Sequence, residues 1–216
     1  MKLPSLRDAV LGRMRGRTRI RDRGARNHVD VHATARLRGV TLDLGGDDIE
    51  IVVGGASRLR NVRIVCEGDG LRVSIGERVK VRVGAELVLR DRGSSIEIGD
   101  GVSIESARVV SLEGRGVSIG AGSMLAYDIE IRNSDSHSIL DASTGARLNP
   151  PADVVLDEHV WVGARCSVLK GTRVGRDSIL GMGSVVSGQF PEGVVVAGCP
   201  ATVRRTGVTW TQERTS

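Results

Sequence analysis

The sequence predicts an all-β chain folded as a parallel β-solenoid, and three observations lead to that fold class. Aliphatic residues recur every six positions over long stretches, 29 glycines are available for turns, and only 2% of the 216 residues are aromatic. A six-residue period matches neither the 3.6-residue period of a helix nor the two-residue period of a long strand. It matches a short strand plus a turn, stacked in successive coils.

The clearest repeat runs without interruption from residue 156 to residue 185. Each hexapeptide carries an aliphatic residue and, four positions later, a small or β-branched residue. The aliphatic positions are Leu156, Val162, Val168, Val174, Leu180 and Val186, and the small positions are Val160, Cys166, Thr172, Ser178 and Ser184. Three such units make one triangular coil of about 18 residues. We expect the aliphatic side chains to fill a core too narrow for aromatic rings.

Earlier segments carry the same unit with interruptions. The pairs Ile75-Gly76, Ile98-Gly99 and Ile119-Gly120 repeat it, and the stretches 90–95 and 112–116 break its phase. We interpret these breaks as turns that lengthen a coil. The sequence therefore predicts one solenoid domain over residues 41–205, followed by a tail over residues 206–216 that packs loosely or across subunits.

Residues 1–40 are expected to form an irregular basic cap. Residues 1–38 hold eleven basic and three acidic side chains, whereas the rest of the chain is slightly acidic. Apolar residues at helical spacing, which predict a short amphipathic helix, are Leu3, Leu6, Val10, Leu11 and Met14. We favour a cap over peripheral contact with an anionic membrane, because the end layer of a solenoid must be covered. Nucleic-acid binding is disfavoured, since no aromatics interleave the basic residues.

Composition also bears on the compartment. No apolar run approaches the ~20 residues of a membrane span, and the N-terminus lacks the continuous apolar core of a signal peptide. Cys66, Cys166 and Cys199 form no CxxC pair, so neither a zinc knuckle nor a disulfide framework is indicated. We expect a cytoplasmic protein with reduced thiols, and we place Cys166 in the core.

Three segments in order resemble motifs of the hexapeptide-repeat acyltransferases. Residues 132–139, Arg-Asn-Ser-Asp-Ser-His-Ser-Ile, are similar to the active-site loop of sugar O-acetyltransferases that modify capsule, lipopolysaccharide or exopolysaccharide. Residues 158–164, Glu-His-Val-Trp-Val-Gly-Ala, and residues 196–201, Val-Ala-Gly-Cys-Pro-Ala, are similar to the next signature and to the terminal motif. The resemblance implies a left-handed β-helix, a homotrimer with its sites between subunits, and acetyl-CoA as co-substrate.

The loop 132–153 interrupts the repeat and is expected to leave the solenoid on its binding face. Transfer of an acetyl group from a thioester to a hydroxyl needs a base, and histidine, with a free pKa of about 6.5, suits that role. The resemblance implies that His137 is the base and that transfer is direct, with no acyl-enzyme. Asp135 is expected to orient the imidazole, a job that a backbone carbonyl would also do. His159 is interpreted as a surface residue.

The resemblance places coenzyme A against the last coils. The expected contacts are Trp161, Gly163, Ala164, Gly181, Ser184, Arg204 and Arg205. Trp161 is expected to point outward, beside the pocket or in the trimer interface. The glycines would let the pantetheine chain approach the backbone, although turn formation explains them equally well. The two arginines suit the geometry of phosphates, while the lysines common in the family are replaced by Gly188 and Thr202.

No metal is expected. The gamma-type carbonic anhydrases share this solenoid but need three converging histidines, and the repeat region holds only His137 and His159. The resemblance thus favours an O-acetyltransferase that acts on a saccharide or glycolipid. Two alternatives stay open: a maltose- or galactoside-type enzyme for small free sugars, and a solenoid scaffold without catalysis.

Overall fold

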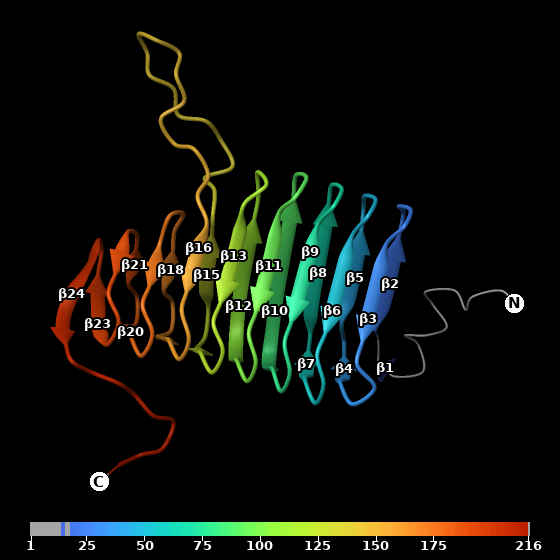
Figure 1. Cartoon of the computed structure of the whole chain (residues 1–216), viewed down its shortest axis with the longest axis horizontal. Coiled ribbons are helices and arrows are strands. Elements are labelled where there is room, and N and C mark those ends of the chain that lie inside the picture. The colour runs from blue at the N-terminus through green and yellow to red at the C-terminus, as the bar shows by residue number, and fades with distance from the viewer. Residues whose placement is uncertain (1–13, 16–17, 216) are drawn as a thin grey trace, which may run out of the picture.

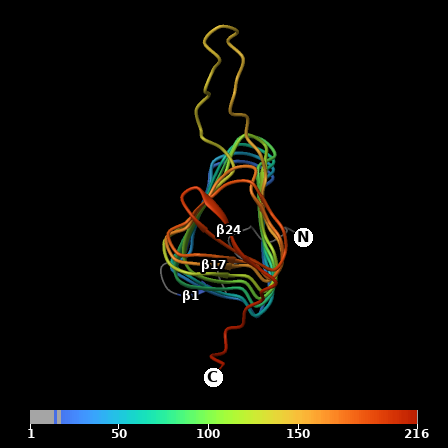
Figure 2. The same ribbon diagram turned by 90° about the vertical axis from the view of Figure 1, so that its left-hand side faces the viewer.

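The computed structural model describes residues 14–15 and 18–215, and 24 strands account for the regular structure of this part of the chain. The strands wind into a parallel solenoid of triangular cross-section, and the coils stack along the long axis (Figures 1 and 2). No helix in the described range is long and apolar enough to cross a membrane. The predicted amphipathic helix lies outside the described residues, apart from Met14, whose backbone begins β1.

Three faces make up the triangle. The first face holds β1 (Met14–Arg15), β4 (Arg36–Arg38), β7 (Arg58–Arg60), the start of β10 (Lys80–Arg90) and of β12 (Ser103–Ser111), β14 (Met124–Leu125), β17 (Trp161–Val162), β20 (Ile179–Leu180), β23 (Val194–Gly198) and β24 (Ala201–Thr206). The second face holds β2 (Arg19–Asp22), β5 (Thr41–Leu44), β8 (Val62–Glu67), the ends of β10 and β12, β15 (Ile129–Arg132), β18 (Ser167–Val168) and β21 (Val185–Val186). The third face holds β3 (His28–Val31), β6 (Glu50–Val53), β9 (Arg72–Ile75), β11 (Ser95–Ile98), β13 (Gly116–Ile119), β16 (Val154–Leu156), β19 (Arg173–Val174) and β22 (Gln189–Phe190).

Coil length changes along the solenoid. In the C-terminal half Trp161 pairs with Ile179, which gives the predicted 18-residue coil. Toward the N-terminus Val29 pairs with Ile51, so each coil there is about four residues longer. The added residues lie in longer strands on the second face, where β8 has 6 residues and β18 has 2.

Regular coils begin well before residue 41, within residues 1–40, for which the sequence predicts an irregular cap. Strands β2, β3 and β4 already pair in parallel register with β5, β6 and β7. The prediction of an irregular cap is therefore wrong for residues 19–40. Two of the basic residues that suggested it, Arg36 and Arg38, flank Leu37, whose side chain is buried in the core together with those of Val29 and Val31.

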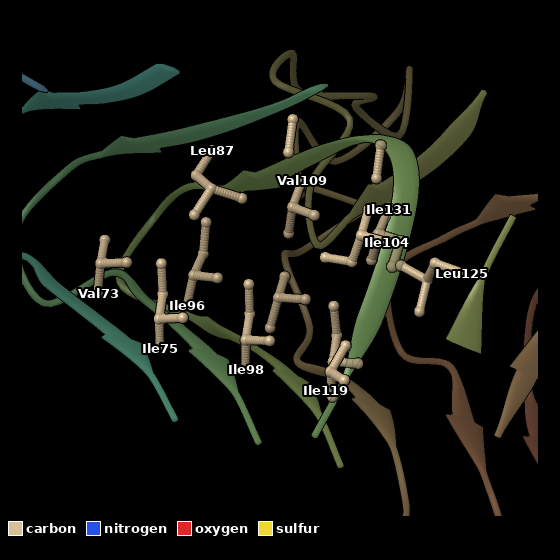
Figure 3. Packing of buried hydrophobic residues seen from close by; sticks show 14 of the residues in the cluster. Val73, Ile75, Leu87, Ile96, Ile98, Ile104, Val109, Ile119, Leu125 and Ile131 are labelled. Atoms are coloured by element: carbon tan, nitrogen blue, oxygen red, sulfur yellow. The ribbon is translucent and has the colours of Figure 1, made fainter. Parts of the chain in front are cut away.

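The core is built from the residues that the repeat identifies. All six aliphatic positions from Leu156 to Val186 are 0% exposed, and the five small positions are at most 1% exposed. Figure 3 shows the same stacking further toward the N-terminus, where Ile75, Ile98 and Ile119 lie in one row. Each coil thus adds one layer of apolar side chains, and close packing of these layers holds the solenoid together.

The C-terminal segment returns to the solenoid. β24 runs antiparallel to β23, and Trp210 then packs at 9% exposure against the corner at His159. The two rings stack with centroids 4.2 Å apart, and the Trp210 indole N–H donates to the His159 carbonyl oxygen at 2.7 Å. The tail is therefore anchored on its own chain, contrary to the expectation of loose packing.

Candidate active site

Residues 133–153, here called the arm, leave the solenoid at the corner between the second and third faces (Figures 1 and 2). The arm begins where β15 ends and finishes where β16 begins. Its two sides pair at Leu140 and Arg147 in antiparallel fashion, and the Leu148 amide donates to the Ile139 carbonyl at 2.8 Å. The arm is thus an ordered hairpin-like projection.

His137 lies exposed on the arm with its backbone fixed. The buried side chain of Asn149 donates to the His137 carbonyl at 2.8 Å and accepts from the Ile139 amide at 2.6 Å. The His137 imidazole has no hydrogen-bond partner within the described part of the chain. The ring is therefore presented to solvent from a backbone held in place.

Asp135 is engaged elsewhere. Its carboxylate accepts from Lys170 Nζ at 2.6 Å and from Asn149 Nδ2 at 2.7 Å, rather than from the His137 imidazole. The hydrogen bond from Lys170 and that from Asn149 lower the pKa of Asp135 below its ordinary value. Within this chain Asp135 therefore ties the start of the arm to the next coil.

A second ion pair fastens the other side of the arm. Arg147 Nη2 donates to Glu113 at 3.0 Å, and Ser134 Oγ donates to the same carboxylate. These hydrogen bonds, that from Arg147 foremost, lower the pKa of Glu113 to about 2.

No motif in the sequence predicts a role for the four residues that hold the arm: Asn149, Lys170, Glu113 and Arg147. The Asn-Pro-Pro run at residue 149 marks a constrained bend, which is the one local signal they offer.

The expected cofactor residues gather at the C-terminal end. Trp161 is 37% exposed on β17, and its ring centroid lies 6.0 Å from that of Trp210. Gly163 and Gly181 occupy the corner between the first and second faces on consecutive coils. A Cβ added at Gly163 would lie 2.7 Å from the Leu180 carbonyl oxygen, so coil stacking by itself requires glycine there.

Comparison with known proteins decides the family, although no family model matches the chain. The crystal structure of the polySia-specific acetyltransferase NeuO superposes with a TM-score of 0.85 at 27% identity, covering 92% of this chain and 91% of NeuO. The chain belongs to the hexapeptide-repeat β-helix acetyltransferases. It is an O-acetyltransferase, as the motifs imply.

Sequence comparison agrees with the structural match. The chain is 26% identical over 150 residues to a polysialic acid O-acetyltransferase of Neisseria meningitidis, which covers 69% of each protein. It is 31% identical over 94 residues to a polysialic acid O-acetyltransferase of Escherichia coli O1:K1, covering 44% of this chain and 31% of that one. The polysialic acid O-acetyltransferase OatWY shares the fold, with a TM-score of 0.87 at 24% identity over 91% of this chain.

Within this one acetyltransferase chain, the two groups of expected site residues lie apart from each other. The arm with His137 leaves the corner that lies opposite the first face, which carries β17 (Figure 2). Arg204 and Arg205 are exposed on β24, and Arg204 Nε donates to the Ala197 carbonyl at 3.1 Å. Ser184, by contrast, is buried, and its hydroxyl donates to the Gly181 carbonyl at 2.6 Å, as a corner residue would.

Proposed function

We propose that this enzyme transfers the acetyl group of acetyl-CoA to a hydroxyl of a cell-surface saccharide, of the capsular, lipopolysaccharide or exopolysaccharide kind. The observation that carries the proposal is the match to NeuO over 92% of the chain. The relatives named above act on polysialic acid. A sialic acid polymer is accordingly the first acceptor to test.

In the proposed reaction His137 is the general base. Its imidazole takes the proton of the acceptor hydroxyl while the oxygen attacks the thioester carbonyl. The C–S bond of the tetrahedral intermediate then breaks, and the proton passes from the imidazolium to the departing thiolate of coenzyme A. The exposed imidazole, which has no hydrogen-bond partner among the residues that the structure describes, and the fixed backbone around it support this role.

The active unit in this proposal is a homotrimer. The arm of one subunit reaches the coils of its neighbour that carry Trp161, Gly163 and Ala164, so that base and donor meet between subunits. Large apolar side chains on the arm support this arrangement, because Ile139, Leu140 and Leu148 are 58%, 56% and 60% exposed in the single chain. In the same arrangement Arg204 and Arg205 receive the phosphates of coenzyme A.

The test is release of free thiol from acetyl-CoA across a panel of acceptors. The panel holds polysialic acid, lipopolysaccharide, neutral polysaccharides and small galactosides. We expect turnover with one class of cell-surface saccharide, and a loss of at least ~100-fold for His137→Ala. His28→Ala, which removes an exposed histidine from β3, is the matched control and keeps full activity.

Three results would contradict the proposal. Equal rates for wild type and His137→Ala remove His137 from the mechanism. Turnover of small galactosides alone identifies a small-sugar enzyme. Absence of turnover and of acetyl-CoA binding by the folded protein identifies a scaffold.

A further inference from the structure

Five basic side chains line up on the first face of the N-terminal coils. Arg36, Arg58 and Lys80 pair in one row of the parallel register, and Arg38 and Arg60 pair in a second row. All five are exposed, and none forms an ion pair with another described residue. We call these five residues the basic track.

The second face shows what this chain does elsewhere with stacked charges. There Arg63, Glu86, Arg108 and Glu130 alternate in sign from coil to coil, with N–O distances of 3.2, 2.9 and 3.1 Å. Like charges directly opposite each other on neighbouring strands destabilise a sheet, whereas opposite charges stabilise it. Repulsion within the basic track therefore lowers the stability of these coils, whereas on the second face alternating charges avoid such repulsion. A row of like charges kept despite this cost points to a polyanionic ligand.

The basic track also points along the solenoid to the C-terminal coils. The row that contains Lys80 continues in register through Ser103 and Met124 to Trp161. Neighbouring strands are about 4.8 Å apart, and Trp161 lies three strands beyond Lys80 in this row. The backbones of the two residues are therefore roughly 14 Å apart. A flexible chain lying on the first face would contact a cation on each early coil and reach Trp161 with its next residues.

We infer that the basic track holds the acceptor, and that the acceptor is an acidic polysaccharide with carboxylates repeated along its length. This inference rests on the proposed function, because it takes the saccharide to be the acetyl acceptor. A polymer of charged sugars fits the narrow, axial arrangement of the cations. A single-stranded nucleic acid would need aromatic side chains on which to stack, and the track has none among its residues.

The experiment compares two triple variants with wild type. The track variant carries Arg58→Thr, Arg60→Thr and Lys80→Thr. The control variant carries Arg63→Thr, Arg72→Thr and Arg90→Thr, which removes the same charge from ion-paired arginines away from the track. Threonine suits exposed strand positions, so both variants keep the strand pattern.

Steady-state acetylation is measured with long polysialic acid and with its disaccharide. We expect the track variant to raise KM for the long polymer by roughly tenfold with kcat retained, since each exposed charge contributes modestly. The disaccharide is too short to span from the track to Trp161, and its KM stays at the wild-type value. The control variant behaves as wild type with both acceptors. The track variant also melts at a higher temperature than wild type, because repulsion is removed.

Binding of the long polymer without acetyl-CoA separates this inference from the proposed function. If wild type binds the polymer and the track variant does not, the basic track is supported as the binding site. If wild type then also fails to acetylate the polymer, only the proposed function is contradicted. Acetylation of the polymer with an unchanged KM in the track variant overturns the track and leaves the proposed function standing. Tighter binding to vesicles of equal parts phosphatidylglycerol and phosphatidylcholine, or to duplex DNA, overturns the assignment of the acceptor as occupant.

Discussion

Gly163 illustrates how a single residue can serve two purposes. The absence of a side chain lets the next coil approach, because a Cβ would collide with the backbone at Leu180 and Met182. At Gly181 a Cβ would lie 2.8 Å from the Ala197 side chain. The family resemblance assigns both glycines to the pantetheine groove, yet packing within one chain is a sufficient reason for them.

Substitution at Gly163 tells the two roles apart. We expect Gly163→Ala to lower the free energy of unfolding by about 1–3 kcal/mol, because the neighbouring coil must shift. Chemical unfolding measures it. Gly70→Ala is the control, since a Cβ there has open space around it and adds only the strain of a positive φ, about 1 kcal/mol. A Gly163→Ala protein as stable as wild type but weaker toward acetyl-CoA would make Gly163 a cofactor residue alone.

The arm is the element on which the proposed chemistry depends, and two ion pairs hold it. Lys170 binds its first side through Asp135, and Glu113 binds its return side through Arg147. The side chains of Glu113 and Arg147 are 25% and 30% exposed, so solvent screens their attraction only in part. The arm is therefore fastened on both sides within its own chain.

The Glu113 anchor should respond to acid. Its pKa is lowered from 4.5 to about 2, so its stabilisation is complete above pH 4.5 and is lost as the pH falls through 2. We expect Glu113→Gln to lose about 1 kcal/mol of stability near neutral pH, after allowance for screening. Urea unfolding of both proteins across this range checks it. The gap between them closes near pH 2; a constant gap at every pH would contradict the assigned anchor.

At the scale of the whole molecule, the prediction to test is that the protein forms a homotrimer. We expect the purified protein to have a mass of three times 22.9 kDa by light scattering. The variant Ile139→Ser, Leu140→Ser and Leu148→Ser keeps its β-sheet circular dichroism, becomes monomeric and loses acetyl transfer, because the apolar tip of the arm no longer docks. A wild-type monomer with full activity would contradict the shared site.

How much of this molecule the sequence reveals depends on the period of each part. Between Leu156 and Val186 the same side-chain type returns every six residues, so the coils and their core are predictable. Toward the N-terminus the motif Arg36-Leu37-Arg38 returns only at Arg58-Leu59-Arg60. Because this period is longer than six residues and the motif is mostly charged, the sequence does not reveal these coils as a repeat. His137 is found through its motif. The residues that hold the arm in place are not predictable in this way. Lys170 and Asp135, for example, are 35 residues apart in the sequence and come together only because the coils stack.

Strand β24 has a consequence for self-assembly. A stack of parallel coils ends in open backbone groups, onto which the coil of another molecule could add and start a fibre. On the first face β24 covers the edge of β23 and runs in the opposite direction, with Arg204 and Arg205 exposed upon it. A second solenoid that approaches this end therefore meets a positively charged strand that runs antiparallel to the strands of its own coils. We therefore expect β24, with the two arginines proposed to hold phosphates, to disfavour end-to-end polymerisation of the solenoid.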